Sequence, residues 1–267
     1  MTQEERLDYL IRELVKENTD FWDTEIPSDV TERKHLLRTL MNVRMPAEID
    51  PDLLRIQGAY LAERLSSLPV TDADTLVPVK KDPRICLWQG DITLLKADAI
   101  VNAANAQMLG CFYPLHKCID NCIHTYAGME LRLACDSQMK KIRKRLGDSY
   151  LQPTAIPMLT DAFNLPAKKI VHVVGPIITG DVTKEQEEQL ASCYRNTLAL
   201  CAKNGLKSVA FCCISTGEFH FPNRRAAEIA TESVRRALSE NPAVTRVIFN
   251  VFKDEDLAIY DGLLNEA

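Results

Sequence analysis

Short apolar runs alternate with longer amphipathic segments over the C-terminal two thirds of the chain, and this alternation constrains the fold most. The apolar runs cover residues 85–89, 99–102, 170–174, 208–214 and 246–252. Helical patterns lie near residues 120–145, 184–204, 223–240 and 254–265. Several runs are apolar at consecutive positions, as expected for parallel strands covered on both faces. The alternation predicts an α/β sandwich with a mixed, largely parallel sheet.

The first 75 residues have a different, all-helical pattern. Apolar residues recur at helical spacing from Leu7 to Val15 and again from Leu36 to Met41, and a third helical segment opens at Pro51. The stretch from residue 69 to residue 83 is polar and contains three prolines, so it suits a linker. We expect residues 1–75 to form a helical extension with its linker, and residues 76–267 to form the main domain.

Composition excludes several classes of protein. The net charge of -5 argues against broad nucleic-acid binding, which needs a strongly cationic surface. No apolar stretch approaches the roughly 18–20 residues that span a bilayer, and the N-terminal segment does not resemble a secretion signal. Nine scattered cysteines argue against a disulfide scaffold. We expect a cytoplasmic protein that binds neither nucleic acid nor membrane.

Ligands of parallel sheets bind at the carboxyl ends of the strands, so the loops after Asn102, Val174 and Ile214 are the first places to look for a site. The common glycine-rich dinucleotide loop, the Walker loop, the H-E-x-x-H metalloprotease helix and the G-x-S-x-G elbow are absent from the sequence. Their absence removes the most common dinucleotide, nucleotide-hydrolase and esterase interpretations.

Two of these strand ends carry residues suited to a nucleotide. Asn102 and Asn105 follow one strand, where their amides can bind a sugar, although both residues could equally cap turns. After another strand, successive backbone N–H groups from Ser215 to Phe219 can cradle a diphosphate before a helix that opens at Pro222.

Five motifs occur in order along the chain. They are W-Q-G-D-I-T at 88–93, D-A-I-V-N-A-A-N at 98–105, Y-A-G at 126–128, L-P-A-K-K-I-V-H-V-V-G-P at 165–176 and C-I-S-T-G-E-F at 213–219. This combination resembles the macrodomain family, and specifically its MacroD-type hydrolases, over about residues 75–265. The resemblance implies a three-layer α/β/α sandwich with a mixed central sheet, with the N-terminal helices outside it.

The resemblance also implies an ADP-ribose site. Asp91 would bind the adenine amino group, the Ile92 backbone would contact a ring nitrogen, and Asn105 would hold the distal ribose. The diphosphate would be wrapped by the loop of Ser215, Thr216, Gly217, Glu218 and Phe219, with Phe219 packing beside the distal ribose. Asp120 matches the acidic residue that orients or deprotonates a water in the family, so Asp120 and Asn105 are the implied catalytic residues.

One loop departs from the family pattern. The usual glycine-rich loop is replaced by a segment that carries Cys111, His116 and Cys118 in Cys-x4-His-x-Cys spacing. Two thiolates and an imidazole suit Zn²⁺, and three protein ligands leave a fourth position open, as in catalytic sites. The loop is similar to that of a zinc-containing subgroup of microbial protein-ADP-ribose hydrolases. We therefore expect one Zn²⁺ per chain.

Other cysteines and histidines are interpreted as structural. Cys122 and His124 also occur in zinc-free relatives and are expected to pack within a helix, although Cys122 could replace Cys118 as a ligand if that helix begins early. His172 is expected in the core, His220 in a loop near the pocket, and His35 in the helical extension. The pair Cys212 and Cys213 is expected to pack at the end of a strand.

These observations predict a zinc-dependent hydrolase that removes mono-ADP-ribose from modified proteins. Zinc would hold a ribose hydroxyl or polarise a water, Asp120 would act as base, and Glu218 is a second candidate carboxylate. Three alternatives stay open: a reader that binds ADP-ribosylated protein without hydrolysis, an O-acetyl-ADP-ribose deacetylase, and a zinc that only shapes the loop. The resemblance suggests a lipoyl carrier protein as substrate and a sirtuin-like ADP-ribosyltransferase as counterpart.

Overall fold

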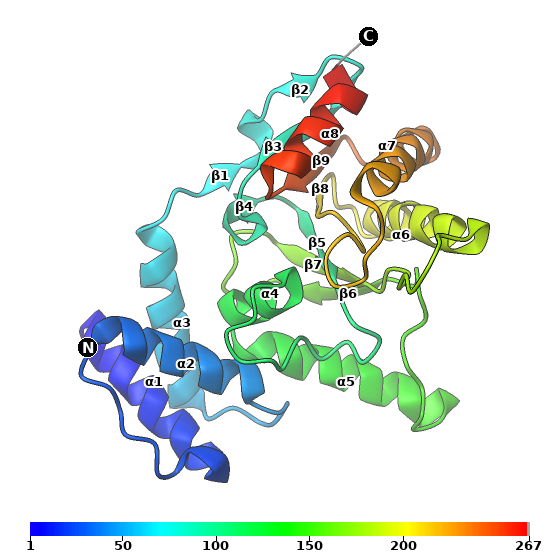
Figure 1. The fold of residues 1–267 in the computed structure, drawn as a ribbon. Coiled ribbons are helices and arrows are strands. Elements are labelled where there is room, and N and C mark those ends of the chain that lie inside the picture. The colour runs from blue at the N-terminus through cyan, green and yellow to red at the C-terminus, as the bar shows by residue number, and fades with distance from the viewer. Residues whose placement is uncertain (266–267) are drawn as a thin grey trace. The chain divides into compact units, whose positions relative to one another are not determined.

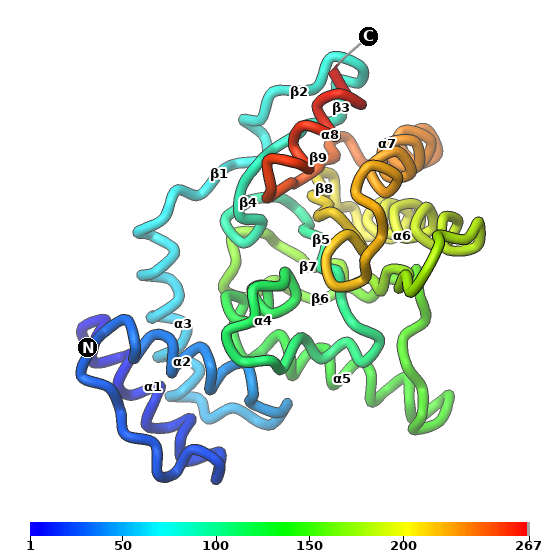
Figure 2. The backbone as a smooth tube through the Cα atoms, viewed as in Figure 1, coloured from blue at the N-terminus to red at the C-terminus, as the bar shows by residue number. Residues whose placement is uncertain are grey.

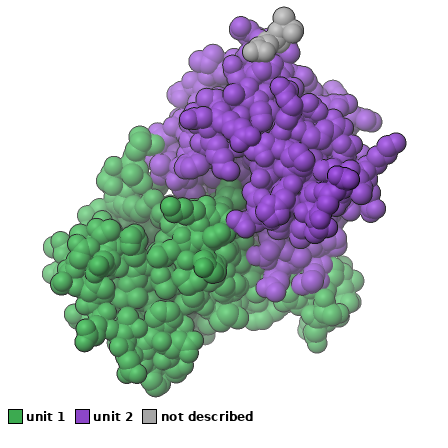
Figure 3. Space-filling view, in the orientation of Figure 1, with its two compact units in different colours: residues 1–69, 109–150, 163–165 green, residues 70–108, 151–162, 166–267 purple. Residues whose placement is uncertain are grey.

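The computed structural model describes residues 1–265, and the chain forms two compact units (Figure 3). The first unit contains residues 1–69, 109–150 and 163–165, and the remaining residues up to 265 belong to the second unit. No helix within residues 1–265 is long and apolar enough to cross a membrane. The domain boundary near residue 75 stays a prediction.

The second unit is built on a seven-stranded sheet in the order β2-β3-β9-β8-β5-β7-β6 (Figures 1 and 2). Its strands are β2 (Pro78–Val79), β3 (Asp82–Gln89), β5 (Ala99–Ala103), β6 (Met158–Asp161), β7 (Lys169–Val173), β8 (Ser208–Phe211) and β9 (Arg246–Val251). The five central strands are mutually parallel, and the edge strands β2 and β6 pair antiparallel. The short strands β1 (Thr71–Asp72) and β4 (Leu95–Lys96) form a separate parallel pair. The predicted α/β architecture with a mixed sheet is confirmed.

Three helices of the same unit flank the sheet: α6 (Lys184–Lys203), α7 (Asn223–Glu240) and α8 (Asp254–Asn265). Helix α6 begins at a capping box in which Thr183 and Gln186 satisfy each other's backbone N–H groups. Its buried face carries Tyr194, which packs against Phe211 of β8. The predicted helical segments at 184–204, 223–240 and 254–265 therefore agree with the structure to within one residue.

The regular secondary structure of the first unit is helical. It contains α1 (Gln3–Glu17), α2 (Val30–Val43), α3 (Pro51–Ser66), α4 (Ile119–Ala127) and α5 (Met129–Leu146). Leucines and isoleucines of α1, α2 and α3 share one buried cluster, which also includes Met129 at the start of α5. The predicted N-terminal helices are confirmed, and burial of their apolar faces explains why short helices are stable here.

The prediction of a single helix near residues 120–145 is wrong, because Gly128 separates two helices, α4 and α5. Gly128 has φ +98°, a backbone conformation that residues with a Cβ rarely adopt. A Cβ at this position would also lie 2.6 Å from Glu130 Oε2 and 2.8 Å from Gln57 Nε2. The break therefore depends on glycine.

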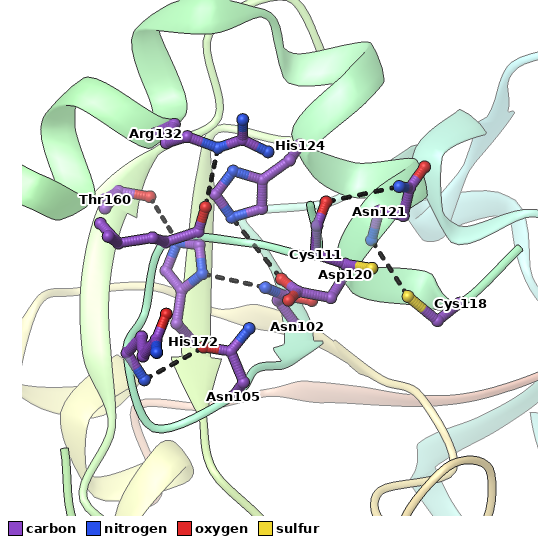
Figure 4. A network of polar contacts seen from close by, with 12 residues as sticks. Asn102, Asn105, Cys111, Cys118, Asp120, Asn121, His124, Arg132, Thr160 and His172 are labelled. Atoms are coloured by element: carbon purple, nitrogen blue, oxygen red, sulfur yellow. Dashed lines mark hydrogen bonds and ion pairs between the residues drawn. The ribbon is translucent and has the colours of Figure 1, made fainter. Parts of the chain in front are cut away.

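His172 of β7 lies in the core of the second unit, as predicted. Asn102 Nδ2 donates to its Nδ1 at 3.1 Å, and its Nε2 lies 2.9 Å from Thr160 Oγ1 (Figure 4). Because Nδ1 accepts, Nε2 carries the proton and donates to the threonine. Complete burial lowers the pKa of His172 to about 3, because the charged ring would lack the solvation that water gives it.

This lowered pKa predicts a loss of stability in mild acid. The unfolded chain takes up a proton at His172 below about pH 6.5, whereas the native chain does so only near pH 3, so the stabilisation falls as pH drops between these values. From pH 6.5 to pH 5 this single group should cost about 2 kcal/mol of unfolding free energy. Urea titrations at both pH values should show a smaller loss of unfolding free energy for His172→Gln than for the wild type. Equal losses in the two proteins would contradict the assignment of this acid sensitivity to His172.

Candidate functional site

The loops that follow the parallel strands gather the predicted nucleotide-binding residues of the second unit. Asp91 comes after β3, Asn105 after β5 and Ser215 after β8. Because these strands are parallel, their carboxyl ends lie at the same edge of the sheet. The structure therefore places the three segments at the edge where α/β sheets bind ligands.

Asp91 shapes the turn after β3. Its Oδ1 accepts from Thr93 N at 2.9 Å and from Thr93 Oγ1 at 2.7 Å, and so caps the short helical turn Ile92–Leu94. The Ile92 side chain is buried, which fixes the turn against the core. A half-buried carboxylate beside an anchored backbone suits a ligand with both a donor and an acceptor edge, as adenine has.

The loop of residues 212–221 folds back tightly on itself. Ser215 has φ +66°, Phe221 N donates to Ser215 O at 2.9 Å, and His220 N donates to Gly217 O at 3.0 Å. The Ser215 hydroxyl oxygen is buried without a hydrogen-bond partner among the described residues. A Cβ at Gly175 would lie 2.1 Å from this oxygen, so glycine is required there. Gly217 and Glu218 are exposed at the tip, where backbone groups can reach a ligand.

Asn102, near the end of β5, and Asn105, just after this strand, have different environments. Asn102 is fully buried and binds His172, so it is part of the core and not of a ligand site. Asn105 is half-buried, and its Oδ1 accepts from Gln107 N at 3.0 Å (Figure 4). Turn capping thus occupies one atom of Asn105, and its role at a ribose stays a prediction.

The loop before α4, in the first unit, brings the three predicted metal ligands together. Ligand atoms of Cys111, His116 and Cys118 all lie within 4.8 Å of one another, and all three residues are partly buried. Cys111 Sγ lies 3.6 Å from His116 Nδ1. Sulfur and nitrogen ligands of a tetrahedral zinc are about 3.5 Å apart, given the usual Zn–S and Zn–N lengths. The spacing and chemistry of the trio therefore fit Zn²⁺.

The other candidate ligands have separate contacts. Cys122 Sγ lies 3.6 Å from Arg38 Nη2 on α2, whereas Cys118 caps α4 and accepts from Asn121 N at 3.4 Å. The structure groups Cys118, and not Cys122, with the other two ligands. Burial raises the pKa of the Cys118 thiol to about 12, and nearby Cys111 adds to the rise. Cys212 is buried at the end of β8 and Cys213 partly so, in line with packing roles.

Asp120 lies in the first turn of α4, two residues after Cys118. It is buried, and its Oδ1 lies 3.6 Å from His124 Nε2 (Figure 4). The histidine ring in turn packs on Gly110 of the ligand loop. His124 thus fills a packing position, as predicted, and its ring lies beside the Asp120 carboxylate. His35 of α2 and His220 of the 212–221 loop are exposed.

Three residues that sequence reasoning missed hold the ligand loop. Arg38 and Asn42 project from α2 toward it, and the largely buried Arg132 of α5 donates to Leu109 O at 2.8 Å. Burial lowers the pKa of Arg132 to about 10, and Asp120 opposes that shift. Arg38 and Asn42 are four residues apart on α2, next to its buried apolar residues. Two polar residues on one helix face were the available signal.

Gly110 provides a test of the loop conformation. Its φ is +80°, and an added Cβ would lie 2.7 Å from His124 Cγ. Gly110→Ala should therefore lower the free energy of unfolding by about 2 kcal/mol or more, from backbone strain together with displacement of the buried ring. Gly147→Ala, also at positive φ but with open space around it, is the matched control. Thermal unfolding compares them, and equal losses would show that contact with His124 does not matter.

Comparison with known proteins identifies the class. The Macro domain family model matches residues 101–230. The chain is 46% identical to the protein-ADP-ribose hydrolase of Treponema medium over 99% of its own length and 100% of the relative's. It belongs to the Macro domain family, with a mixed seven-stranded sheet flanked by helices and an N-terminal helical segment.

Further relatives share this assignment. A protein-ADP-ribose hydrolase of Staphylococcus aureus is 43% identical over 97% of this chain and 95% of the relative. Among solved structures, the Trypanosoma brucei macrodomain in complex with ADP-ribose superposes with a TM-score of 0.65 at 30% identity, covering 85% of this chain and 95% of that one. Both the sequence and the fold thus connect this chain with ADP-ribose macrodomains.

Proposed function

We propose that this protein is a zinc-dependent hydrolase that removes mono-ADP-ribose from modified proteins. The observation that carries the proposal is the convergence of Cys111, His116 and Cys118 within 4.8 Å in one loop of a macrodomain. Full-length relatives at 43% and 46% identity are named protein-ADP-ribose hydrolase, which supports hydrolysis over simple binding.

ADP-ribose binding is assigned to the second unit. The Trypanosoma brucei macrodomain was solved with ADP-ribose, and the strand-end loops here have the chemistry that this ligand requires. Asp91 and the Ile92 backbone would bind adenine, backbone N–H groups of residues 215–219 would bind the diphosphate, and Asn105 would bind the distal ribose. Phe219 would pack beside that ribose.

The chemical step is hydrolysis of the bond between the anomeric carbon and the protein side chain. Water adds its oxygen to that carbon, its proton is taken up, and the side chain leaves with a proton. Zinc held by Cys111, His116 and Cys118 would supply a Lewis acid. Asp120, whose carboxylate lies beside His124, would orient the attacking water and accept its proton. Glu218, exposed on its loop, is the second candidate carboxylate.

Separating hydrolysis from binding tests this proposal. The protein is incubated with mono-ADP-ribosylated proteins of several linkages, including a modified lipoyl carrier protein, while calorimetry measures its affinity for ADP-ribose. Release of ADP-ribose from at least one substrate is expected. Tight binding without release from any of them would identify a reader, and turnover of O-acetyl-ADP-ribose alone would identify a deacetylase. Either result overturns the proposal.

A further inference from the structure

Side chains, and not a helix or strand ladder, hold the backbone of the metal-ligand loop at residues 109–118. Arg132 Nε donates to Leu109 O at 2.8 Å, and Asn121 Nδ2 donates to Tyr113 O at 3.0 Å and to Cys111 O at 3.4 Å. Figure 4 shows Asn121 between Cys111 and Cys118. The positions of the ligand side chains therefore depend on these polar contacts.

Helix α2 supplies two further contacts to the same loop. Asn42 is 1% exposed, and its Oδ1 accepts from Leu115 N at 3.0 Å while its Nδ2 donates to Thr125 Oγ1 at 2.9 Å. Arg38 Nη2 donates to the carbonyl oxygen of the ligand His116 at 2.7 Å. One side of α2 thus binds two consecutive residues of the loop, Leu115 and His116, the second of which is a predicted ligand.

Arg38 also orients the residue that holds the other end of the loop. Its Nη2 donates to Asn121 Oδ1 at 2.8 Å, so the Asn121 amide is turned with Nδ2 toward the loop carbonyls. Thr125 Oγ1 donates to Asn121 O at 2.7 Å and accepts from Asn42, which closes the network. A buried polar network of this kind fixes one arrangement, because each lost bond leaves a desolvated group behind.

The network contacts the loop where its backbone conformation is least favourable. Leu115 has φ +59°, a conformation that side-chain-bearing residues adopt only when their surroundings impose it. The bond from Leu115 N to Asn42 lies at this residue, and the bond from Arg38 lies at the next one. Together with the turn bond from His116 N to Tyr113 O, the two bonds from α2 hold the loop backbone at Leu115 and at His116, whose ring meets Cys111.

We propose that Arg38 and Asn42 are positioning residues for the metal ligands, so that helix α2 of the N-terminal segment supports metal binding. This inference rests on the proposed zinc site. Partners that orient metal ligands through other groups typically change metal affinity about 10- to 100-fold when they are removed. We expect that range for Arg38→Met and for Asn42→Ala.

Zinc affinity of the full-length chain tests the inference, measured by competition with a chromophoric chelator. Arg33→Met is the matched control, because Arg33 is on the same helix but pairs with Asp8 and Glu4 and not with the loop. It should lower thermal stability while leaving zinc affinity within about twofold. Arg38→Lys keeps the positive charge and one hydrogen-bonding nitrogen, and should bind zinc with an affinity between those of the wild type and Arg38→Met.

A second readout needs no metal. In the metal-free protein, amide hydrogen exchange across residues 109–118 should be faster for Arg38→Met, or for Arg38→Lys if the first variant does not fold, than for Arg33→Met. Wild-type protein that binds no zinc would overturn the zinc proposal and this inference together. Wild-type zinc binding with equal affinity and equal exchange in the Arg38 and Arg33 variants would overturn this inference alone.

Discussion

Cys118→Ala should lose its zinc and hydrolyse mono-ADP-ribosylated protein more than about 100-fold more slowly than the wild type. Removing a ligand costs more affinity than removing a residue that merely orients one, for which 10- to 100-fold is typical. Cys118 also caps α4, two residues before Asp120, so its loss affects both the metal and the start of that helix. Metal analysis and a release assay measure the two effects.

Cys122→Ala is the matched control for this substitution. Cys122 is one turn further along α4, is also partly buried, and contacts Arg38 instead of the other ligands. It should keep one zinc per chain and most of its activity. If Cys122→Ala loses the metal while Cys118→Ala retains it, Cys122 is the ligand and the assigned trio is wrong.

Asp120→Asn should lower kcat by about 10²- to 10⁴-fold, the range of a general base, while ADP-ribose affinity and zinc content stay close to those of the wild type. Asparagine preserves the shape of the side chain but cannot accept the proton of the attacking water. Single-turnover release, calorimetry with ADP-ribose and metal analysis separate the three quantities.

Asp136→Asn controls for the loss of a buried carboxylate in the same unit. Asp136 lies on α5, is buried, and pairs with Lys140 at 2.7 Å. Its substitution should reduce stability more than turnover. Equal losses of kcat in both variants, or an unchanged kcat in Asp120→Asn, would remove Asp120 from the mechanism.

Much of the fold was accessible from the sequence because buried parallel strands carry a strong local signal. The apolar runs at residues 99–102 and 246–252 correspond to β5 and β9 to within one residue at each end. β6 was missed because it has four residues, of which only Met158 and Thr160 are buried, and pairs at an edge. The division at Gly128 was missed because the flanking segments share one helical periodicity, and only the positive φ of the glycine separates them.

The candidate site was predictable only where its residues are close in sequence. Cys111, His116 and Cys118 fall within eight residues, so spacing alone suggested a metal loop. Arg38 contacts His116 across a separation of 78 residues, and no local pattern reports such a contact. The same holds for the burial of Asn102, whose partner His172 is 70 residues away.

The most direct test of zinc-dependent hydrolysis is to measure ADP-ribose release by the purified protein as isolated, after chelation, and after zinc is restored. Zinc per chain and circular dichroism are recorded on each sample. We expect one zinc per chain, loss of release in a metal-free protein that remains folded and still binds ADP-ribose, and recovery with zinc. Full release by the folded, metal-free protein would contradict this expectation.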